Sequence, residues 1–329
     1  MKTRLCMLAS AAALAFAPWT VQAQSAGAAP AFVASKAMHI VAPSSPGGIL
    51  DQTSRLVAKS LSEVVKQPVI VDNAPGAGGT IGIQAMLRAE PDGHTLVMGS
   101  LGPNAANYTL QDKLPYKPED LVGVINVLAM PDVVVVNPKL PIKTVDELKA
   151  YAASNPKGVS MAVSTSGSSG HLAGALLNQR AGIKAVEVVY KGASPALQDL
   201  MAGQVDYMVD NLITALPLIR SGKLRAIAVT TRERAPELPD TPTLIDAGFK
   251  DFDVSVWLGL FVSHKTPPAT VQALNAALNQ AFKDPHLQKT VAAQGGKLVG
   301  GSTQTFEGFV RAERTRWAQV IKAGNIKAE

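Results

Sequence analysis

Three turns rich in glycine, serine and threonine each follow an apolar run and precede a helical pattern. They are PSSPGGILD at 43–51, STSGSSGHL at 164–172 and YKGASPAL at 190–197. The first turn of a helix directs unpaired backbone N–H groups outward, and such groups bind anions. Taken alone, the first turn could be an ordinary glycine turn capped by Asp51. Three such turns after strands predict a ligand cleft at the carboxyl ends of two sheets.

The second turn also holds groups that could form a serine hydrolase. Ser168, Ser169 and His171 are close in sequence, and Asp210 lies downstream. However, no serine stands at the centre of a G-x-S-x-G motif, and triads are usually assembled from separate loops. The alternative is that the serines cap a helix that His171 begins. An exported hydrolase using Ser168 or Ser169 with His171 is therefore the competing hypothesis, which an ester-hydrolysis assay would test.

Metal and nucleotide chemistry have weaker support. The histidines lack metal-ligand spacing and are better explained as surface or capping residues than as ligands; they are His39, His94, His171, His264 and His286. Glycines at 76, 78 and 82 follow a strand, but no acidic residue stands at a fitting distance for a dinucleotide fold. We predict no metal, no cofactor and no catalytic residue.

The first 23 residues have the pattern of a cleavable secretory signal. Lys2 and Arg4 precede an apolar run at 7–16, and VQA at 21–23 forms a cleavage site. The run is shorter than the ~20 residues that a membrane span needs. The only cysteine, Cys6, leaves with this signal. We therefore expect a periplasmic protein without disulfides or cysteine metal sites.

The remaining chain is long enough for about two domains. Residues 24–35 are rich in Ala, Gly and Ser and are predicted to be a leader. The formal net charge of the whole chain, +6, is spread along it without runs of Lys and Arg. This distribution favours small anionic ligands and predicts no nucleic-acid partner.

Strands and helices alternate along the chain, which predicts an α/β fold. Thr144 and Glu147 form a capping box that predicts a helix through Ala153. Apolar runs predict strands at 38–43, 68–73, 94–100, 133–137, 160–165, 186–190, 205–209 and 224–229. We expect the chain to cross between domains at about Val124 to Val136 and Ser255 to Val262. Domain 1 is then discontinuous, at 36–130 and 258–329, and domain 2 spans 131–257.

At several segments the sequence resembles the Bug, or TctC-like, substrate-binding proteins of tripartite tricarboxylate transporters. Among them are VIVDNAPGAGGTIG, PDGHTLVMGS, SSGHLAGAL and VVYKGASPALQDLMAGQVDYMVDN. The similarity runs in order along essentially all of the mature chain. It implies two α/β domains linked by two strands, in the class II periplasmic-binding arrangement, that close around a small carboxylate. It also implies that the protein is not an enzyme.

The resemblance assigns ligand contacts to the three turns. The domain-one loop corresponds to Ser44, Ser45, Gly47 and Gly48, with Asp51 on the following helix. The loop that grips the carboxylate corresponds to Thr165, Ser166, Gly167, Ser168 and Ser169. The turn that adds a backbone amide corresponds to Gly192 and Ala193, and Asp210 follows a strand near the cleft.

Two apolar residues depart from the family pattern. Ile49 and Leu50 stand where the family more often has a small or hydroxyl residue. If their side chains line the cleft, they favour a ligand with one carboxylate and an apolar remainder. If they pack into the core, they leave the ligand unrestricted. Trp257 presents the same choice between cleft and core.

The resemblance implies a receptor that closes like a hinge on a small organic acid. The expected partners are the membrane permease subunits of a tripartite tricarboxylate transporter or a sensor kinase, and the expected oligomeric state is a monomer. The sequence does not select one carboxylate.

Overall fold

The computed structural model describes residues 32–156, 158–190, 192–324 and 326. The predicted signal at 1–23 and the predicted leader up to residue 31 lie outside these residues. The strands are β1 (Met38–Ala42), β2 (Val69–Asn73), β3 (Thr95–Ser100), β4 (Leu121–Val136), β5 (Val159–Val163), β6 (Ala185–Val189), β7 (Tyr207–Asn211), β8 (Arg225–Val229), β9 (Ser255–Ser263) and β10 (Lys297–Gly300).

Helices follow most of the strands, so the α/β class is confirmed. The α-helices are α1 (Ile49–Val65), α2 (Thr80–Arg88), α3 (Asn107–Leu110), α4 (Val145–Ser154), α5 (Ser169–Ala181), α6 (Ala193–Ala202), α7 (Leu212–Arg220), α8 (Pro268–Ala281), α9 (Pro285–Ala293) and α10 (Thr303–Gly324). Shorter helical turns are η1 (Ala77–Gly79), η2 (Gly102–Ala106) and η3 (Pro118–Asp120).

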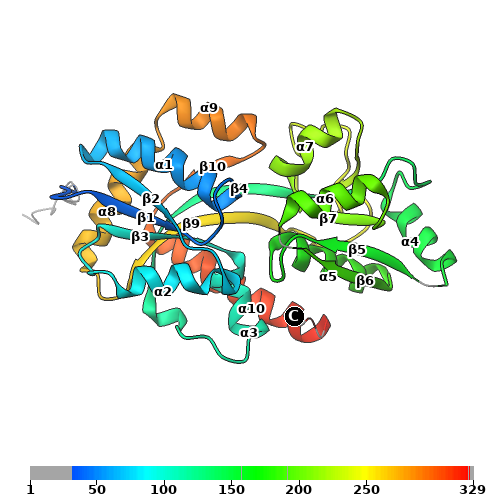
Figure 1. The fold of residues 1–329 in the computed structure, drawn as a ribbon, viewed down its shortest axis with the longest axis horizontal. Helices are drawn as coiled ribbons and strands as arrows, with labels where there is room; N and C mark the ends of the chain where they lie inside the picture. Colours follow the sequence, from blue (N-terminus) through cyan, green and yellow to red (C-terminus); the bar gives the residue numbers. More distant parts are fainter. Residues whose placement is uncertain (1–31, 157, 191, 325, 327–329) are drawn as a thin grey trace, which may run out of the picture.

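The strands form two halves that share β4 (Figure 1). Hydrogen bonds link them in the order β2-β1-β3-β9-β4-β7-β5-β6, and β10 and β8 also pair with β4. Up to Pro131, β4 pairs with β9; from Asp132 onward it pairs with β7. This change of partner within one strand turns the chain from one half into the other. The predicted two-domain binding-protein fold is confirmed, whereas its exact residue bounds stay a prediction.

Local sequence explains why the elements begin where they do. The predicted capping box is confirmed: the Glu147 N–H donates to Thr144 Oγ1, and the Thr144 N–H donates to Glu147 Oε2, both at 3.1 Å. Helix α1 buries Val57 and Leu61, four residues apart, against the first half. The sequence did not predict β10, and it ended the seventh strand two residues before Asn211.

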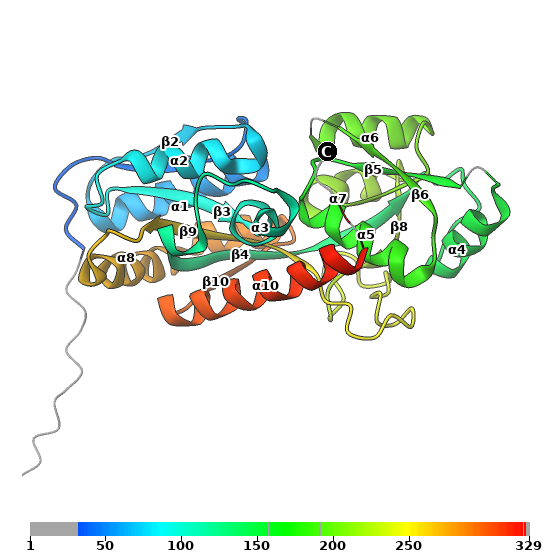
Figure 2. The same ribbon diagram turned by 90° about the horizontal axis from the view of Figure 1, so that it is seen from below.

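Helix α10 ties the two halves together from one side. It runs along the first half and reaches α5 of the second half (Figure 2). One buried cluster contains Phe306 and Trp317 of α10 together with Leu172 of α5. In the part of the chain that the structure describes, no helix is long and apolar enough to span a membrane.

Candidate ligand-binding site

The domain-one turn is held by Asp51 at the start of α1. Its carboxylate, 3% exposed, accepts hydrogen bonds from the Gly47 N–H at 2.8 Å, from Arg55 Nε at 2.9 Å and from Asn73 Nδ2 at 2.9 Å. Burial alone would raise the pKa of Asp51, but these hydrogen bonds outweigh it and lower the pKa. Asp51 therefore serves as a structural anion that shapes the turn.

The groups that the domain-one turn offers to a ligand are mostly backbone. Ser45 and Gly47 are exposed. Gly48 is the N-cap of α1, and no side chain accepts a hydrogen bond from the first turn at this cap. The Ser44 hydroxyl oxygen is buried and has no hydrogen-bond partner among the described residues. The N–H groups of the first turn of α1 therefore remain the best anion donors in this half.

Ile49 and Leu50 are half-buried and pack against the buried cluster of the first half. This packing favours the core alternative for their side chains. Their N–H groups belong to the first turn of α1, so these residues can still present backbone donors at the turn. The predicted preference for an apolar ligand stays a prediction.

The second turn caps α5. Ser168 is the N-cap, and its Oγ accepts a hydrogen bond from the His171 N–H at 3.2 Å, as the capping alternative predicted. Thr165 is exposed and Ser166 is half-buried, whereas Gly167 and Ser169 are buried. The N–H groups of the first turn of α5 therefore stand beside the Ser168 hydroxyl, which can also donate to an anion, whereas the Thr165 hydroxyl donates to the Ser164 carbonyl oxygen at 2.7 Å.

His171 is buried in the first turn of α5, so of the two predicted positions, surface or capping, the structure shows the capping one. Its Nδ1 accepts from the Gly167 N–H at 2.9 Å, and its Nε2 lies 3.0 Å from Glu187 Oε2. Because Nδ1 accepts, the ring proton is on Nε2 and points to the carboxylate. His94 is also buried.

The same geometry gives no support to the hydrolase hypothesis. Both ring nitrogens of His171 are occupied by groups other than a serine hydroxyl. The Ser169 hydroxyl donates to Asp132 at 3.2 Å instead. A nucleophile needs its hydroxyl hydrogen-bonded to a base, and the described residues of this turn do not provide that arrangement.

The third turn lies beside the second. The Gly192 N–H donates to the Ser164 carbonyl oxygen at 2.8 Å, so this amide already has an acceptor. Ala193 begins α6, and its N–H has no acceptor within the helix. Of the two predicted residues, Ala193 therefore offers the better donor for a ligand.

Asp210 lies within β7 rather than after it, which corrects the predicted position. Its carboxyl is 2% exposed and accepts from the Thr214 hydroxyl. Burial raises the pKa of Asp210 to about 6. In this conformation the side chain faces the protein interior rather than solvent.

The segment 102–107 of the first half, which no sequence pattern pointed to, contacts the second turn of the other half. A Cβ atom on Gly102 would lie 3.3 Å from the Gly167 carbonyl oxygen, and one on Gly167 would lie 3.3 Å from Asn107 Oδ1. Asn107 also donates from Nδ2 to the Gly78 carbonyl oxygen at 3.1 Å. The start of η2 and α3 therefore forms a wall against the second turn.

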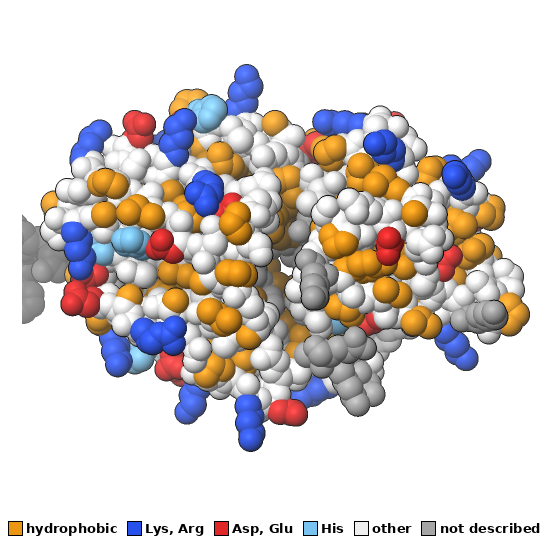
Figure 3. Space-filling model, in the orientation of Figure 1, with side chains coloured by type: hydrophobic (Ala, Val, Ile, Leu, Met, Phe, Trp, Pro, Cys, Tyr) orange, Lys and Arg blue, Asp and Glu red, His pale blue; other side chains and the backbone are white. Residues whose placement is uncertain are grey.

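A crevice separates the two halves in the space-filling view (Figure 3). Most of the atoms along its visible walls are hydrophobic or uncharged. The predicted turns come from both halves: 43–51 from the first, and 164–169 and 192–193 from the second. Whether these residues bind a ligand stays a prediction.

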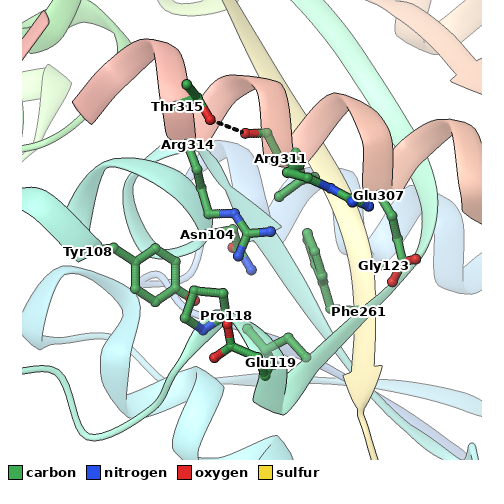
Figure 4. Close-up of a pocket in the computed structure, with 12 residues that line it drawn as sticks. Asn104, Tyr108, Pro118, Glu119, Gly123, Phe261, Glu307, Arg311, Arg314 and Thr315 are labelled. Carbon is green, nitrogen blue, oxygen red and sulfur yellow. Dashed lines mark hydrogen bonds between the residues drawn. The ribbon is translucent and has the colours of Figure 1, made fainter. Parts of the chain in front are cut away.

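A separate pocket of about 560 Å³ lies on the α10 face (Figure 4). Arg311, Arg314, Glu119 and Glu307 are among its lining residues, and the Arg314 guanidinium lies 6.0 Å from the Tyr108 ring centroid. None of the predicted site residues lines it. Because this pocket is lined by both acidic and basic side chains, it does not favour an anion in the way that the N–H groups of a helix start do.

Trp257 belongs to the core rather than to the cleft. It is 1% exposed, and its Nε1 donates to Glu313 Oε2 at 3.1 Å. Trp317 donates to the same oxygen at 3.0 Å.

No group of three or more His, Cys, Asp or Glu residues that could hold a metal ion occurs in the described ranges.

Two α/β halves joined by shared strands, with a crevice between them and a glycine- or serine-capped helix start in each half, define a solute-binding protein of the periplasmic type. The chain belongs to the tripartite tricarboxylate transporter family receptor group, TctC, whose family model matches residues 53–326. Members of this family are substrate-binding receptors rather than enzymes. The suspected family resemblance is thus confirmed.

Known proteins of this family are similar over most of their length. Protein BugT of Bordetella pertussis is 35% identical over 295 residues, which cover 89% of this chain and 90% of BugT. The solved structure of R. palustris Rpa4515 with adipate has a TM-score of 0.83 and 32% identity, covering 89% of this chain and 98% of that one. MatC from Rhodopseudomonas palustris with bound malate has a TM-score of 0.80 and 32% identity, covering 87% and 99%.

Proposed function

We propose that this protein is an extracytoplasmic receptor that binds one small organic carboxylate in the crevice between its halves. The main support is the pair of helix starts, at Gly48 before α1 and at Ser168 before α5, one from each half. Similar proteins with adipate and malate bound support a carboxylate ligand. Dicarboxylates of four to six carbons are therefore the first candidates.

The proposed mechanism is closure onto the anion. First-turn N–H groups of α1 and α5 each hold part of the ligand, with the Ser168 hydroxyl as a further donor. The Thr165 hydroxyl donates to the Ser164 carbonyl oxygen at 2.7 Å and would join them by turning to the ligand. Because the two sets of donors come from different halves, both can be used only when the crevice shuts. Ligand binding energy then favours the closed state.

The cellular role follows from family membership and from the predicted secretory signal. We propose that the mature receptor is a periplasmic monomer without catalytic activity. It delivers its ligand to the membrane permease subunits of a tripartite tricarboxylate transporter, and a sensor kinase is the alternative partner. Fractionation of cells that express the full chain tests the location, since the mature protein should appear in the periplasmic fraction.

A thermal-shift panel tests the ligand class. Adipate, malate, succinate, citrate and benzoate are compared with glucose and an uncharged amide at matched concentrations. A ligand present at 100 times its dissociation constant adds about 2.7 kcal/mol to the free energy of unfolding. At least one carboxylate should raise the melting temperature while glucose and the amide leave it unchanged. A response to the neutral compounds alone would contradict the proposal.

A further inference from the structure

Asp132 stands where β4 changes its partner strand. Pro131 is the last residue of β4 paired with β9, and Asp132 is the first paired with β7. The Asp132 N–H donates to Thr230 Oγ1 at 3.1 Å, and its carbonyl oxygen accepts from the Thr230 N–H at 3.0 Å. Thr230 Oγ1 also donates to the Val254 carbonyl oxygen at 2.7 Å, just before β9. Asp132 is therefore fixed at the junction of both connecting strands.

The side chain of Asp132 links this junction to the second turn. Its Oδ1 accepts from Ser169 Oγ at 3.2 Å and from Asn211 Nδ2 at 2.7 Å. Ser169 is the first residue of α5, and Asn211 directly precedes α7. The carboxyl thus holds the beginnings of two helices against the connecting strand.

The other carboxyl oxygen has no such role. Asp132 is 0% exposed, and its Oδ2 has no hydrogen-bond partner among the described residues. An ionised carboxylate with one bare buried oxygen is costly, and protonation removes that charge. Burial raises the pKa of Asp132 to about 7; hydrogen bonds from Asn211 and Ser169 oppose this rise, and the charge of Asp210 adds to it.

The elements packed around Asp132 contribute one charged neighbour. Strand β7 contributes Asp210, which pairs with the next residue of β4 and is itself buried. Helix α5 contributes the Ser169 hydroxyl, while its His171 ring is engaged with Glu187. Thr230 faces the backbone and is neutral. The starts of α5 and α7 favour negative charge, as they would for a ligand anion.

We propose that Asp132 is a positioning residue that holds the first turn of α5 in its ligand-binding geometry, and that binding of a carboxylate there is accompanied by proton uptake at Asp132. This proposal rests on the proposed function. A ligand anion at the first turn of α5 and an ionised Asp132 are like charges on opposite sides of Ser169. Each disfavours the other, so the bound anion favours the protonated acid.

The direction of the pH effect follows from that repulsion. If the anion raises the Asp132 pKa by about one unit, the affinity changes about tenfold across the titration. The protonated form binds the anion more tightly, so affinity falls as the pH rises from 6 to 8. Binding takes up protons within the same interval and none well above it.

The test is calorimetric titration of the mature protein with adipate between pH 6 and 8.5, in buffers of different ionisation enthalpy. Adipate ionises identically in every experiment, so differences between variants report the protein. Wild type should take up protons and lose about fivefold in affinity between pH 6 and pH 8, which is most of the roughly tenfold change across the whole titration. Asp132→Asn keeps an acceptor for Ser169 and should show no proton uptake and an affinity change below about twofold. The exposed Asp112→Asn is the matched control and should behave as wild type.

Asp132→Ala removes the acceptor as well, and it should bind adipate more weakly than Asp132→Asn at every pH. Proton uptake that persists in Asp132→Asn, or wild-type affinity in Asp132→Ala, would overturn the proposal. If neither adipate nor malate binds any variant, the proposed function fails and so does the binding half of this proposal. Carboxyl titration of the ligand-free protein by NMR still decides whether Asp132 is protonated near neutral pH. A measured pKa near 4 would overturn the proposed proton uptake at Asp132.

Discussion

Gly102 and Gly167 approach each other across the crevice so closely that a Cβ atom on Gly102 would lie 3.3 Å from the Gly167 carbonyl oxygen. Gly102 begins η2 in the first half, and Gly167 precedes the Ser168 cap of α5 in the second. The contact is made by backbone, which cannot rearrange as a side chain can. The fit of the two halves around the proposed ligand therefore depends on the absence of a side chain at this point.

Replacing Gly102 should weaken ligand binding. Gly102→Val places branched carbons against the Gly167 carbonyl, so closure should be impeded and the affinity for adipate or malate should fall by about tenfold or more. Calorimetry measures this loss. Gly308→Ala is the matched control, because a Cβ atom there meets nothing within 4 Å. Unchanged affinity in Gly102→Val would show that the halves do not meet here in the bound state.

Removing the Ser168 hydroxyl should weaken carboxylate binding by about 1 to 2 kcal/mol, because a hydroxyl donor and a helix cap are both lost. Thr144→Ala is the matched control, since it removes the cap of α4. It should lower the melting temperature without changing affinity. Lys191→Ala should matter less than Ser168→Ala. The reverse order in calorimetry would mean that a salt bridge, rather than neutral donors, anchors the ligand.

The stability that two buried carboxyl groups contribute should fall as the pH rises from about 4 to about 7. Asp132 and Asp210 have folded-state pKa values raised to about 7 and about 6, from an ordinary value of 3.8. Between about pH 4 and pH 7 these two groups bind more protons in the folded state than in the unfolded state, so their contribution to the free energy of unfolding decreases with rising pH. Above about pH 7 this contribution is constant.

Asp132→Asn isolates the larger of the two effects. At pH 8 the variant should be more stable than wild type by at least about 1 kcal/mol, because it buries no charge. At pH 4 the difference should shrink, since the wild-type carboxyl is then protonated in the folded state. Urea unfolding at both pH values measures this. An equal difference at both pH values would show that packing, not ionisation, separates the two proteins.

Features set by neighbouring residues could be predicted from the sequence. The Thr144–Glu147 capping box and the Ser168 cap depend on residues three apart, and both formed as expected. Apolar runs such as the one at 38–43 marked the strands because buried parallel strands need little else. Chain length and the order of the elements predicted two domains joined by two strands, and the family resemblance added the class II arrangement.

Features set by distant residues could not be predicted. Asp132 lies within the expected crossover at about Val124 to Val136, but no local pattern shows that pairing with β7 buries its carboxyl. The sequence placed His171 at the start of a helix but could not show its partner, because Glu187 lies on another strand. Asp210 was placed after its strand because the end of β7 depends on pairing with β4. Gly102 carried no local signal, since its importance comes from Gly167 in the other half.

A crystal structure of the mature protein with bound adipate tests the central claim most directly. We predict a carboxylate oxygen within about 3.2 Å of the backbone N–H groups of Ser169 or Gly170, and the other end of the ligand facing the first turn of α1. A ligand that lies in the pocket beside Arg311 and Arg314, or that is held in the crevice mainly by a lysine or arginine side chain, would contradict the account.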